Sequence, residues 1–257
     1  MRKNRVKEIC ASGGVAITAW CGSSSPYFTE IAGHGGFDCV TVDMQHGIIG
    51  IETAISCLQA ISSTPAMPML RVPANYGPVI MHALDSGAYG IICPMVSTPD
   101  DARAFVDACL YPPLGTRSFG PQRGLLYGGA DYAQHANDEI LKLAMIETRE
   151  AYTLADEIIA VDGIDGIFVG PSDFSIAWTG GHALNPKLDD MTAAIADIAA
   201  KTKAAGKLAA IYCVDPAQCG PYAAMGYRLL AIQNEGAYLA AGAKAMVEAA
   251  RNAMGQG

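Results

Sequence analysis

Short apolar segments alternate with longer amphipathic ones along the whole chain. The short segments have the apolar character and the length of strands that are buried in a parallel sheet. Eight strands are predicted, at 15–20, 39–43, 67–71, 90–93, 143–147, 166–169, 208–212 and 229–232. Helical patterns follow them in turn, at 26–35, 51–61, 77–87, 98–110, 150–161, 189–206, 215–226 and 236–254.

This alternation predicts the fold class. Strands that alternate with helices run parallel. No linker or low-complexity stretch divides the chain, so we expect one α/β domain over residues 1–257, closed as a (β/α)8 TIM barrel. An open doubly wound sheet is the alternative, but it favours a glycine-rich phosphate loop after the first strand. The "AWCGSSSPY" segment there is no GxGxxG motif, and the chain has no Walker A motif.

The C-terminal helical pattern is rich in small residues, with alanine or glycine at 240–243 and alanine at 245. A smooth apolar face of this kind packs either on its own barrel or against another subunit. The sequence leaves both alternatives open.

Composition narrows the class of protein. Hydrophobic residues make up 51% of the chain and the mean hydropathy is +0.22, so a large core can be buried. The net charge of -8 argues against nucleic-acid binding and suits an enzyme of small molecules.

No CxxC pair occurs among the eight cysteines, which argues for reduced, buried thiols. No apolar run approaches about 18 residues, and polar residues interrupt the basic N-terminus. We therefore expect a cytoplasmic protein with no membrane partner.

Charged residues gather where the predicted strands end. Asp43 ends the second strand and His46 follows in its loop; Arg71 ends the third, Glu147 ends the fifth, and Asp173 follows the sixth in "GPSD". In a TIM barrel, catalytic residues come from these carboxyl ends. An ionised group at the end of a buried strand costs free energy unless it is paired or metal-bound. The five residues together predict an active site.

Their chemistry favours a metal-assisted reaction on an acid. Two carboxylates, Glu147 and Asp173, suit Mg²⁺ or Mn²⁺. The fork of Arg71 fits a carboxylate or a developing enolate oxygen, and His46 can move protons near neutrality. Asp43 could orient the imidazole, raise its pKa, or simply cap the following turn.

A Schiff-base mechanism is not expected, because it needs a desolvated lysine near the carboxyl end of a strand. Lys142 and Lys207 lie at the starts of predicted strands, and none of the other lysines is at a strand end. Trp20 ends the first strand and either lines the site or packs in the core. Arg117 and Arg123, in the loop after "YPPLG", either meet a distal substrate carboxylate or form ion pairs.

Several motifs, in order, resemble one family. "GFDCVTVDMQHG", "RVPAN", "LDSGAYGIICPMVSTPDDA", "YPPLGTRSFG", "AMIETREA" and "VDGIDGIFVGPSDFS" resemble the HpcH/HpaI aldolases, which include 4-hydroxy-2-oxoheptanedioate and 2-keto-3-deoxy-L-rhamnonate aldolases. The resemblance implies a TIM barrel of the phosphoenolpyruvate/pyruvate-domain type. It further implies a class II pyruvate aldolase that depends on Mg²⁺, Mn²⁺ or Co²⁺ and forms a homo-oligomer, a hexamer. The partners would be a 2-oxo acid and an aldehyde.

The same resemblance implies roles for the strand-end residues. The metal-binding glutamate and aspartate of the family match Glu147 and Asp173. Its catalytic arginine and histidine match Arg71 and His46. In this scheme the metal and Arg71 stabilise an enolate, while His46 moves the proton of the hydroxyl at the cleaved bond. The expected reaction is retro-aldol cleavage of a 4-hydroxy-2-oxo acid to pyruvate and an aldehyde.

Three further positions match the family's motifs, and two depart from them. Asp43 opens the histidine motif, Asp85 in "LDSGA" matches an aspartate that supports the histidine, and Ser172 would offer a backbone N–H to the pyruvate carboxylate. Two departures, Gln45 in place of glutamate and Met145 in place of glutamine, put the substrate preference in doubt.

Alternative functions share part of this chemistry. Oxaloacetate decarboxylation would use the same metal and Arg71 without His46 as a base. Acyl-CoA lyases resemble this barrel as well, but the sequence offers no basic surface for a CoA diphosphate. A non-catalytic barrel that binds a 2-oxo acid would have no use for both His46 and the two ligand carboxylates.

Overall fold

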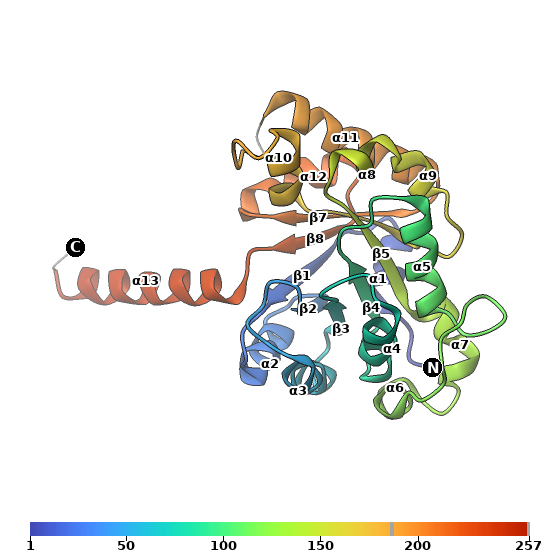
Figure 1. Ribbon diagram of the computed structural model, residues 1–257. Coiled ribbons are helices and arrows are strands. Elements are labelled where there is room, and N and C mark those ends of the chain that lie inside the picture. Colours follow the sequence, from blue (N-terminus) through green and yellow to red (C-terminus); the bar gives the residue numbers. More distant parts are fainter. Residues whose placement is uncertain (186–187, 256–257) are drawn as a thin grey trace.

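The computed structural model describes residues 1–185 and 188–255, and its centre is a closed barrel of eight parallel strands (Figure 1). Each strand pairs with its sequence neighbours, and β8 pairs with β1 to close the barrel. The strands are β1 (Ala16–Cys21), β2 (Cys39–Asp43), β3 (Met67–Arg71), β4 (Gly90–Cys93), β5 (Leu141–Ile146), β6 (Gly166–Val169), β7 (Leu208–Cys213) and β8 (Leu229–Ile232). The predicted TIM barrel is confirmed.

Strand bounds agree closely with the apolar pattern. Those of β2, β3, β4, β6 and β8 match the prediction, while β1 is shifted by one residue and β7 is one residue longer. In β5 the strand begins two residues earlier and stops at Ile146, so Glu147 lies just beyond it. The difference has little effect on the site, because Glu147 still follows the carboxyl end of its strand.

Helices surround the barrel and connect successive strands (Figure 1). In chain order they are α1 (Arg5–Ala11), α2 (Pro26–His34), α3 (Ile51–Ser62), α4 (Gly77–Asp85), α5 (Pro99–Cys109), α6 (Gln122–Gly128), α7 (Tyr132–Glu139), α8 (Arg149–Thr153), α9 (Ala155–Ile159), α10 (Pro171–Trp178), α11 (Asp189–Ala204), the 3-10 turn η1 (Pro216–Gln218), α12 (Cys219–Met225) and α13 (Glu235–Ala253). The short helices α1, α6, α7 and α10, each of seven or eight residues, were not predicted from the sequence.

Two apolar layers hold the barrel together, because parallel strands bury both of their faces. Inside the barrel, Trp20 packs against Phe168 and Tyr212, with both ring centroids 5.5 Å away. Outside the strands, residues such as Ile91 and Phe105 fill the space beneath the helices. The inner layer therefore brings aromatic side chains to the carboxyl-end rim.

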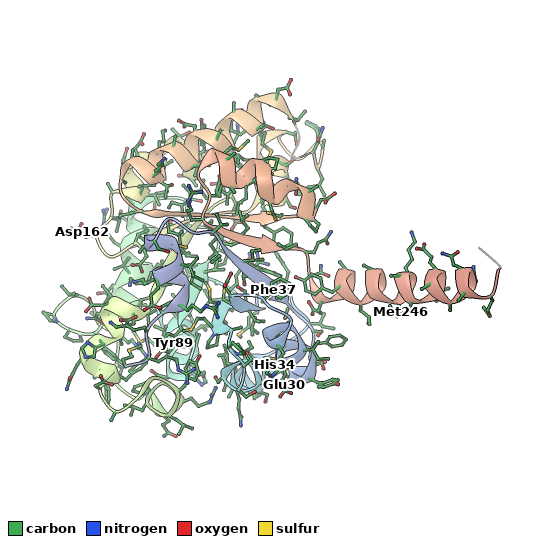
Figure 2. All side chains as sticks on the ribbon, turned by 180° about the vertical axis from the view of Figure 1, so that it is seen from behind. Glu30, His34, Phe37, Tyr89, Asp162 and Met246 are labelled. Carbon is green, nitrogen blue, oxygen red and sulfur yellow. The ribbon has the colours of Figure 1, made fainter. Side chains whose placement is uncertain are left out.

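The last helix, α13, leaves the barrel and extends into solvent (Figure 1). None of its described residues is buried, and Met246 is 70% exposed on the extended part (Figure 2). Leu239, Met246 and Val247 recur at helical spacing and are all exposed. The sequence left open whether this helix packs on its own barrel or against another subunit. In the structure, α13 does not pack along its own barrel.

The described residues bear on two further expectations. No helix among them is both long and apolar enough to span a membrane. All eight cysteines are free, and burial raises the pKa of the Cys39 thiol to about 12, so this thiol packs as a small apolar side chain.

Candidate active site

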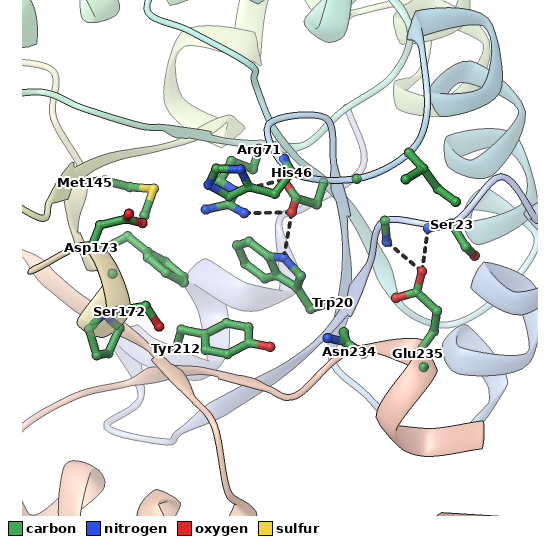
Figure 3. A pocket seen from close by; sticks show the side chains of 18 residues that line it. Trp20, Ser23, His46, Arg71, Met145, Ser172, Asp173, Tyr212, Asn234 and Glu235 are labelled. Carbon is green, nitrogen blue, oxygen red and sulfur yellow. Dashed lines mark hydrogen bonds and ion pairs between the residues drawn. The ribbon is translucent and has the colours of Figure 1, made fainter. Parts of the chain in front are cut away.

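A cavity of about 490 Å³ opens at the carboxyl ends of the strands. Its walls bring together six residues that the sequence singled out, namely Trp20, Asp43, His46, Arg71, Ser172 and Asp173. Figure 3 shows Met145, Ser172 and Asp173 on one side of the cavity and Ser23, Asn234 and Glu235 on the other. Arg71, His46 and Trp20 lie between these two sides.

Asp43 and Arg71 form a buried ion pair at the ends of β2 and β3. The two residues are directly opposite each other in the strand register. Arg71 donates from Nε to Asp43 Oδ1 at 2.8 Å and from Nη2 to Oδ2 at 2.6 Å. Burial alone would raise the pKa of Asp43, but the hydrogen bonds and charge of Arg71 outweigh it and lower that pKa. The lowered pKa favours the ionised form of Asp43, and its two hydrogen bonds fix the orientation of Arg71.

The loop after β2 is organised by the same carboxylate. Asp43 Oδ1 accepts hydrogen bonds from the backbone N–H groups of Gln45 at 3.0 Å and His46 at 3.4 Å. Trp20 adds its indole N–H to Oδ2 at 3.1 Å. Of the interpretations given for Asp43, capping of the following turn is the one that these hydrogen bonds show. The contact is with the backbone of His46, so Asp43 positions the residue through its loop.

Glu147 is buried beside the cavity. Its side chain is 1% exposed, and Oε1 accepts a hydrogen bond from the Met95 N–H at 2.8 Å. Oε2 is buried and has no hydrogen-bond partner among the described residues. Burial, together with the negative charge of Asp173, raises the pKa of Glu147 to about 7. A buried carboxylate oxygen without a partner is a polar group that a cation would satisfy.

The start of α10 delivers the second carboxylate. Asp173 lies in the first turn of the helix, after Gly170 and Pro171. Glycine at 170 leaves room for the carboxylate of Glu147, because a Cβ there would lie 2.6 Å from Glu147 Oε2. Backbone N–H groups in the first turn of a helix have no partner within the helix. Ser172 and Asp173 therefore can present donors to an anion at the cavity wall.

The donor set fits a divalent cation with few protein ligands. Glu147 and Asp173 interact electrostatically, and the orphan oxygen of Glu147 supplies one hard ligand. Among residues 1–185 and 188–255 there is no group of three or more His, Cys, Asp or Glu side chains placed to hold a metal. The two carboxylates would therefore leave several positions for substrate and water, as Mg²⁺ sites commonly do.

Apolar side chains make up much of the remaining wall. Trp20 is 5% exposed and lies 4.8 Å from the guanidinium of Arg71, so it serves both the core and the site. Met145 and Phe168 line the cavity next to Asp173. This apolar surface lowers the local dielectric, so an anion that bound beside Arg71 would interact with it more strongly than in water.

One of the predicted site residues, Asp85, lies away from the cavity of its own chain. Asp85 is the last residue of α4, just before β4 begins, so it lies near the amino-terminal rim of the barrel. It does not line the cavity; it accepts a hydrogen bond from Arg117 Nη2 at 2.9 Å instead. The physical reason is topological, because the helix after a strand runs back toward the opposite rim. Asp85 does not support His46 of its own chain.

The two loop arginines are also engaged elsewhere. Arg117 is 2% exposed and lies between Asp85 and the rings of Tyr111 and Tyr132. Arg123 donates to the carbonyl of Ser86 and to a serine hydroxyl on α3. Of the two alternatives for Arg117, the ion pair is the one found.

Some residues of the site were not identified from the sequence. Tyr212, Asn234 and Glu235 line the cavity at the ends of β7 and β8. Like Asp43 and Arg71, these residues lie at the carboxyl ends of strands, and this position is the signal in the sequence that points to them. Met95 is different: it adopts a φ of 55°, which is uncommon for a residue other than glycine, and only the structure shows that its N–H meets Glu147.

Comparison with known proteins identifies the family of this chain. Residues 16–241 match the model of a family described as HpcH/HpaI aldolase/citrate lyase. A hydroxypyruvate/pyruvate aldolase of Rhizorhabdus wittichii is 37% identical over 96% of this chain and 99% of its own. A 4-hydroxy-2-oxo-heptane-1,7-dioate aldolase of Salmonella dublin is 36% identical over 95% and 93%. The crystal structure of a family protein from Burkholderia cenocepacia superposes with a TM-score of 0.89 at 28% identity, covering 97% of this chain and all of that one. The chain belongs to the HpcH/HpaI aldolase/citrate lyase family and is a carbon–carbon lyase.

Proposed function

We propose that this protein is a class II pyruvate aldolase that cleaves a 4-hydroxy-2-oxo acid to pyruvate and an aldehyde, and runs the reverse addition. The observation that carries the proposal is the unpartnered, buried Oε2 of Glu147 beside Asp173, at the edge of a cavity that also holds Arg71 and His46. Both named relatives are aldolases, and this supports the reaction class.

Glu147 and Asp173 would hold the divalent cation, Mg²⁺, Mn²⁺ or Co²⁺, which supplies Lewis-acid stabilisation of negative charge on the 2-oxo acid. The N–H groups at the start of α10, including that of Ser172, would bind the substrate carboxylate. Arg71 uses Nε and Nη2 on Asp43, which leaves N–H groups to meet the oxygen on which charge develops. Because Asp43 fixes its orientation, Arg71 needs little reorganisation during the reaction.

His46 is the proposed acid–base residue. It lines the cavity, and its loop is anchored by Asp43. In the cleavage direction, His46 would take the proton of the 4-hydroxyl as the bond between C3 and C4 breaks. In the reverse aldol addition, it would return that proton to the new alkoxide. The apolar wall of Trp20, Met145 and Phe168 would limit the access of water to the reacting carbon.

A Schiff-base route is disfavoured by the composition of the site. No lysine is among the described residues that line the cavity, and the buried Lys142 donates to the carbonyls of residues 137 and 140 and pairs with Asp165 at the other end of β5. An imine mechanism needs a lysine at the reacting carbonyl.

Pyruvate release from a panel of 4-hydroxy-2-oxo acids, measured with and without EDTA, tests the proposal. We expect loss of turnover in EDTA and recovery on adding Mg²⁺, Mn²⁺ or Co²⁺. Turnover that survives EDTA and is trapped by borohydride would contradict it. A His46→Ala variant should lose aldol cleavage but retain decarboxylation of oxaloacetate, because decarboxylation releases carbon dioxide without a base. If His46→Ala retained both reactions, His46 would not be the acid–base residue.

We also propose that the protein acts as a homo-oligomer in which α13 packs against a second copy. The exposed apolar face formed by Leu239, Met246 and Val247 supports this, since such a face is unfavourable in water. Light scattering of the Met246→Ser/Val247→Ser variant should show a smaller species than the unaltered protein. An unaltered mass for the variant would argue against the role of this face.

The relatives leave the aldehyde undefined. The Salmonella dublin protein is named for a dioate, whose far end is a second carboxylate, whereas the Rhizorhabdus wittichii protein is named for hydroxypyruvate and pyruvate. Which kind of aldehyde suits this chain depends on the cavity wall opposite Asp173.

A further inference from the structure

The wall opposite Asp173 carries a carboxylate that the proposed chemistry does not use. Glu235 is the first residue of α13, and its Oε1 accepts hydrogen bonds from the backbone N–H groups of Gly22, at 2.8 Å, and Ser23. These bonds tie the loop after β1 to the start of α13. No hydrogen bond reaches Oε2 from the described residues, and Figure 3 shows this second oxygen on the side of Asn234. Glu235 thus offers one free acceptor oxygen at the cavity wall.

The charges around the cavity leave that carboxylate uncompensated. Arg71 is the one Lys or Arg among the described residues lining the cavity, and Asp43 already neutralises it. A divalent cation would balance Glu147 and Asp173. The negative charge of Glu235 is then left over, so an anion bound near it would be repelled at short range through a poorly screening medium.

Among the described residues, this wall has no cationic side chain that could neutralise a second carboxylate. Arg117 and Arg123 are held away from the cavity, as described above. The start of α13 attracts anions in principle, but Asn234 already caps it by accepting from the Ala237 N–H at 3.1 Å, and Glu235 occupies its first turn. The anion-binding capacity of this helix end is therefore already used.

Hydroxyl groups, by contrast, would find partners here. A carboxylate oxygen accepts hydrogen bonds from O–H donors, and such charge-assisted bonds are strong. The hydroxyl of Ser23, a residue that also lines the cavity, is buried and has no partner among the described residues. The side chain of Asn234 lies on the same side of the cavity (Figure 3), and its amide N–H₂ can donate to a bound hydroxyl.

We infer that the aldehyde partner is an uncharged, hydroxylated aldehyde, and that Glu235 is the residue that selects it against aldehydes bearing a carboxylate. The inference rests on the proposed aldolase function and specifies its substrate class. Glu235 would accept a hydrogen bond from a hydroxyl of the aldehyde fragment and would repel a terminal carboxylate at the same place.

The test compares two aldehydes that differ only at the far end. With pyruvate as donor and Mn²⁺ present, kcat/KM is measured for 4-hydroxybutanal and for succinic semialdehyde, which carries a carboxylate where the first carries CH₂OH. Both values are expressed per concentration of open-chain aldehyde, because 4-hydroxybutanal cyclises to a hemiacetal in water. We expect the unaltered enzyme to favour 4-hydroxybutanal at least tenfold. This measurement needs no variant, so it tests the inference even if a substitution impairs folding.

Glu235→Gln then tests the residue itself. The amide oxygen can still accept from Gly22 and Ser23, so the loop stays anchored while the charge is removed. We expect the preference to fall about tenfold through a gain in kcat/KM for succinic semialdehyde, with the KM for pyruvate unchanged. Glu157→Gln, an exposed change on α9 with the same loss of charge, should leave the ratio as it was.

Two results would overturn the inference. One is an unaltered enzyme that uses succinic semialdehyde as well as, or better than, 4-hydroxybutanal. The other is a ratio that Glu235→Gln does not change. In both cases aldol product forms, so the aldolase function stands and only the selectivity is refuted. If neither aldehyde nor glyceraldehyde gave aldol product, the proposed function would fall together with the inference.

Discussion

Replacing Asp43 by asparagine tests how the site is held together. The carboxylate is 4% exposed and its partner Arg71 is 8% exposed, so Asp43→Asn leaves a buried guanidinium without a counter-charge. Removing one partner of a buried ion pair costs about 3–5 kcal/mol. We expect the free energy of unfolding to fall by about 3 kcal/mol, at the lower end of that range. The reason is that asparagine retains one oxygen that can accept from Arg71 or Trp20. For a chain of this size that is a fall in Tm of roughly 6–12 °C.

Urea unfolding of the metal-free protein at pH 7 measures this loss. A double-mutant cycle with Arg71→Met isolates the pair: the double variant should be more stable than the sum of the single losses predicts, because neither charge is then left alone. Asp100→Asn, which breaks the exposed pair between Asp100 and Arg103, is the matched control and should change stability little.

The dependence on pH gives a second readout. The folded-state pKa of Asp43 is lowered, so the pair contributes its full stability above the ordinary carboxyl pKa and loses it as pH falls through the folded value. The difference between the unaltered protein and Asp43→Asn should therefore shrink in acid. Additive losses in the cycle, or a loss below about 1 kcal/mol at pH 7, would refute the view that this pair is tightly coupled.

Two further outcomes follow from the environment of Glu147. Since its pKa is raised from 4.5 to about 7, the folded metal-free protein binds this proton more tightly than the unfolded chain, and stability should fall by about 3 kcal/mol as pH rises from 4 to 8. Glu147→Gln should lack this part of the pH dependence in urea unfolding; an unchanged profile would contradict the assignment. Gly170→Ala would place a Cβ 2.6 Å from Glu147 Oε2, so we expect Mn²⁺ affinity, measured by calorimetry, to fall at least tenfold. Equal affinity in the alanine variant would mean that Oε2 is not a ligand.

The relation between sequence and site is clearest at Asp43 and Asp85. Both are aspartates that end an element, and both match the family's motifs. Asp43 ends a strand, so the parallel barrel carries it to the catalytic rim, where it meets Arg71 in register. Asp85 ends a helix, and the helix returns it to the other rim, where it meets Arg117. A motif match therefore locates a residue in the chain, while the direction of its element locates it in space.

The sequence by itself determined the barrel and most of the strand bounds, because burial on both faces leaves a continuous apolar run that ends where polar chemistry begins. It also determined which charged residues follow the strands. Only the tertiary structure decided which of them meet: the pairing of Asp43 with Arg71, the N–H of Met95 at Glu147, and the second acidic wall at Glu235. These contacts join residues that are far apart in the chain, and closure of the barrel, not any local pattern, brings them within hydrogen-bonding distance.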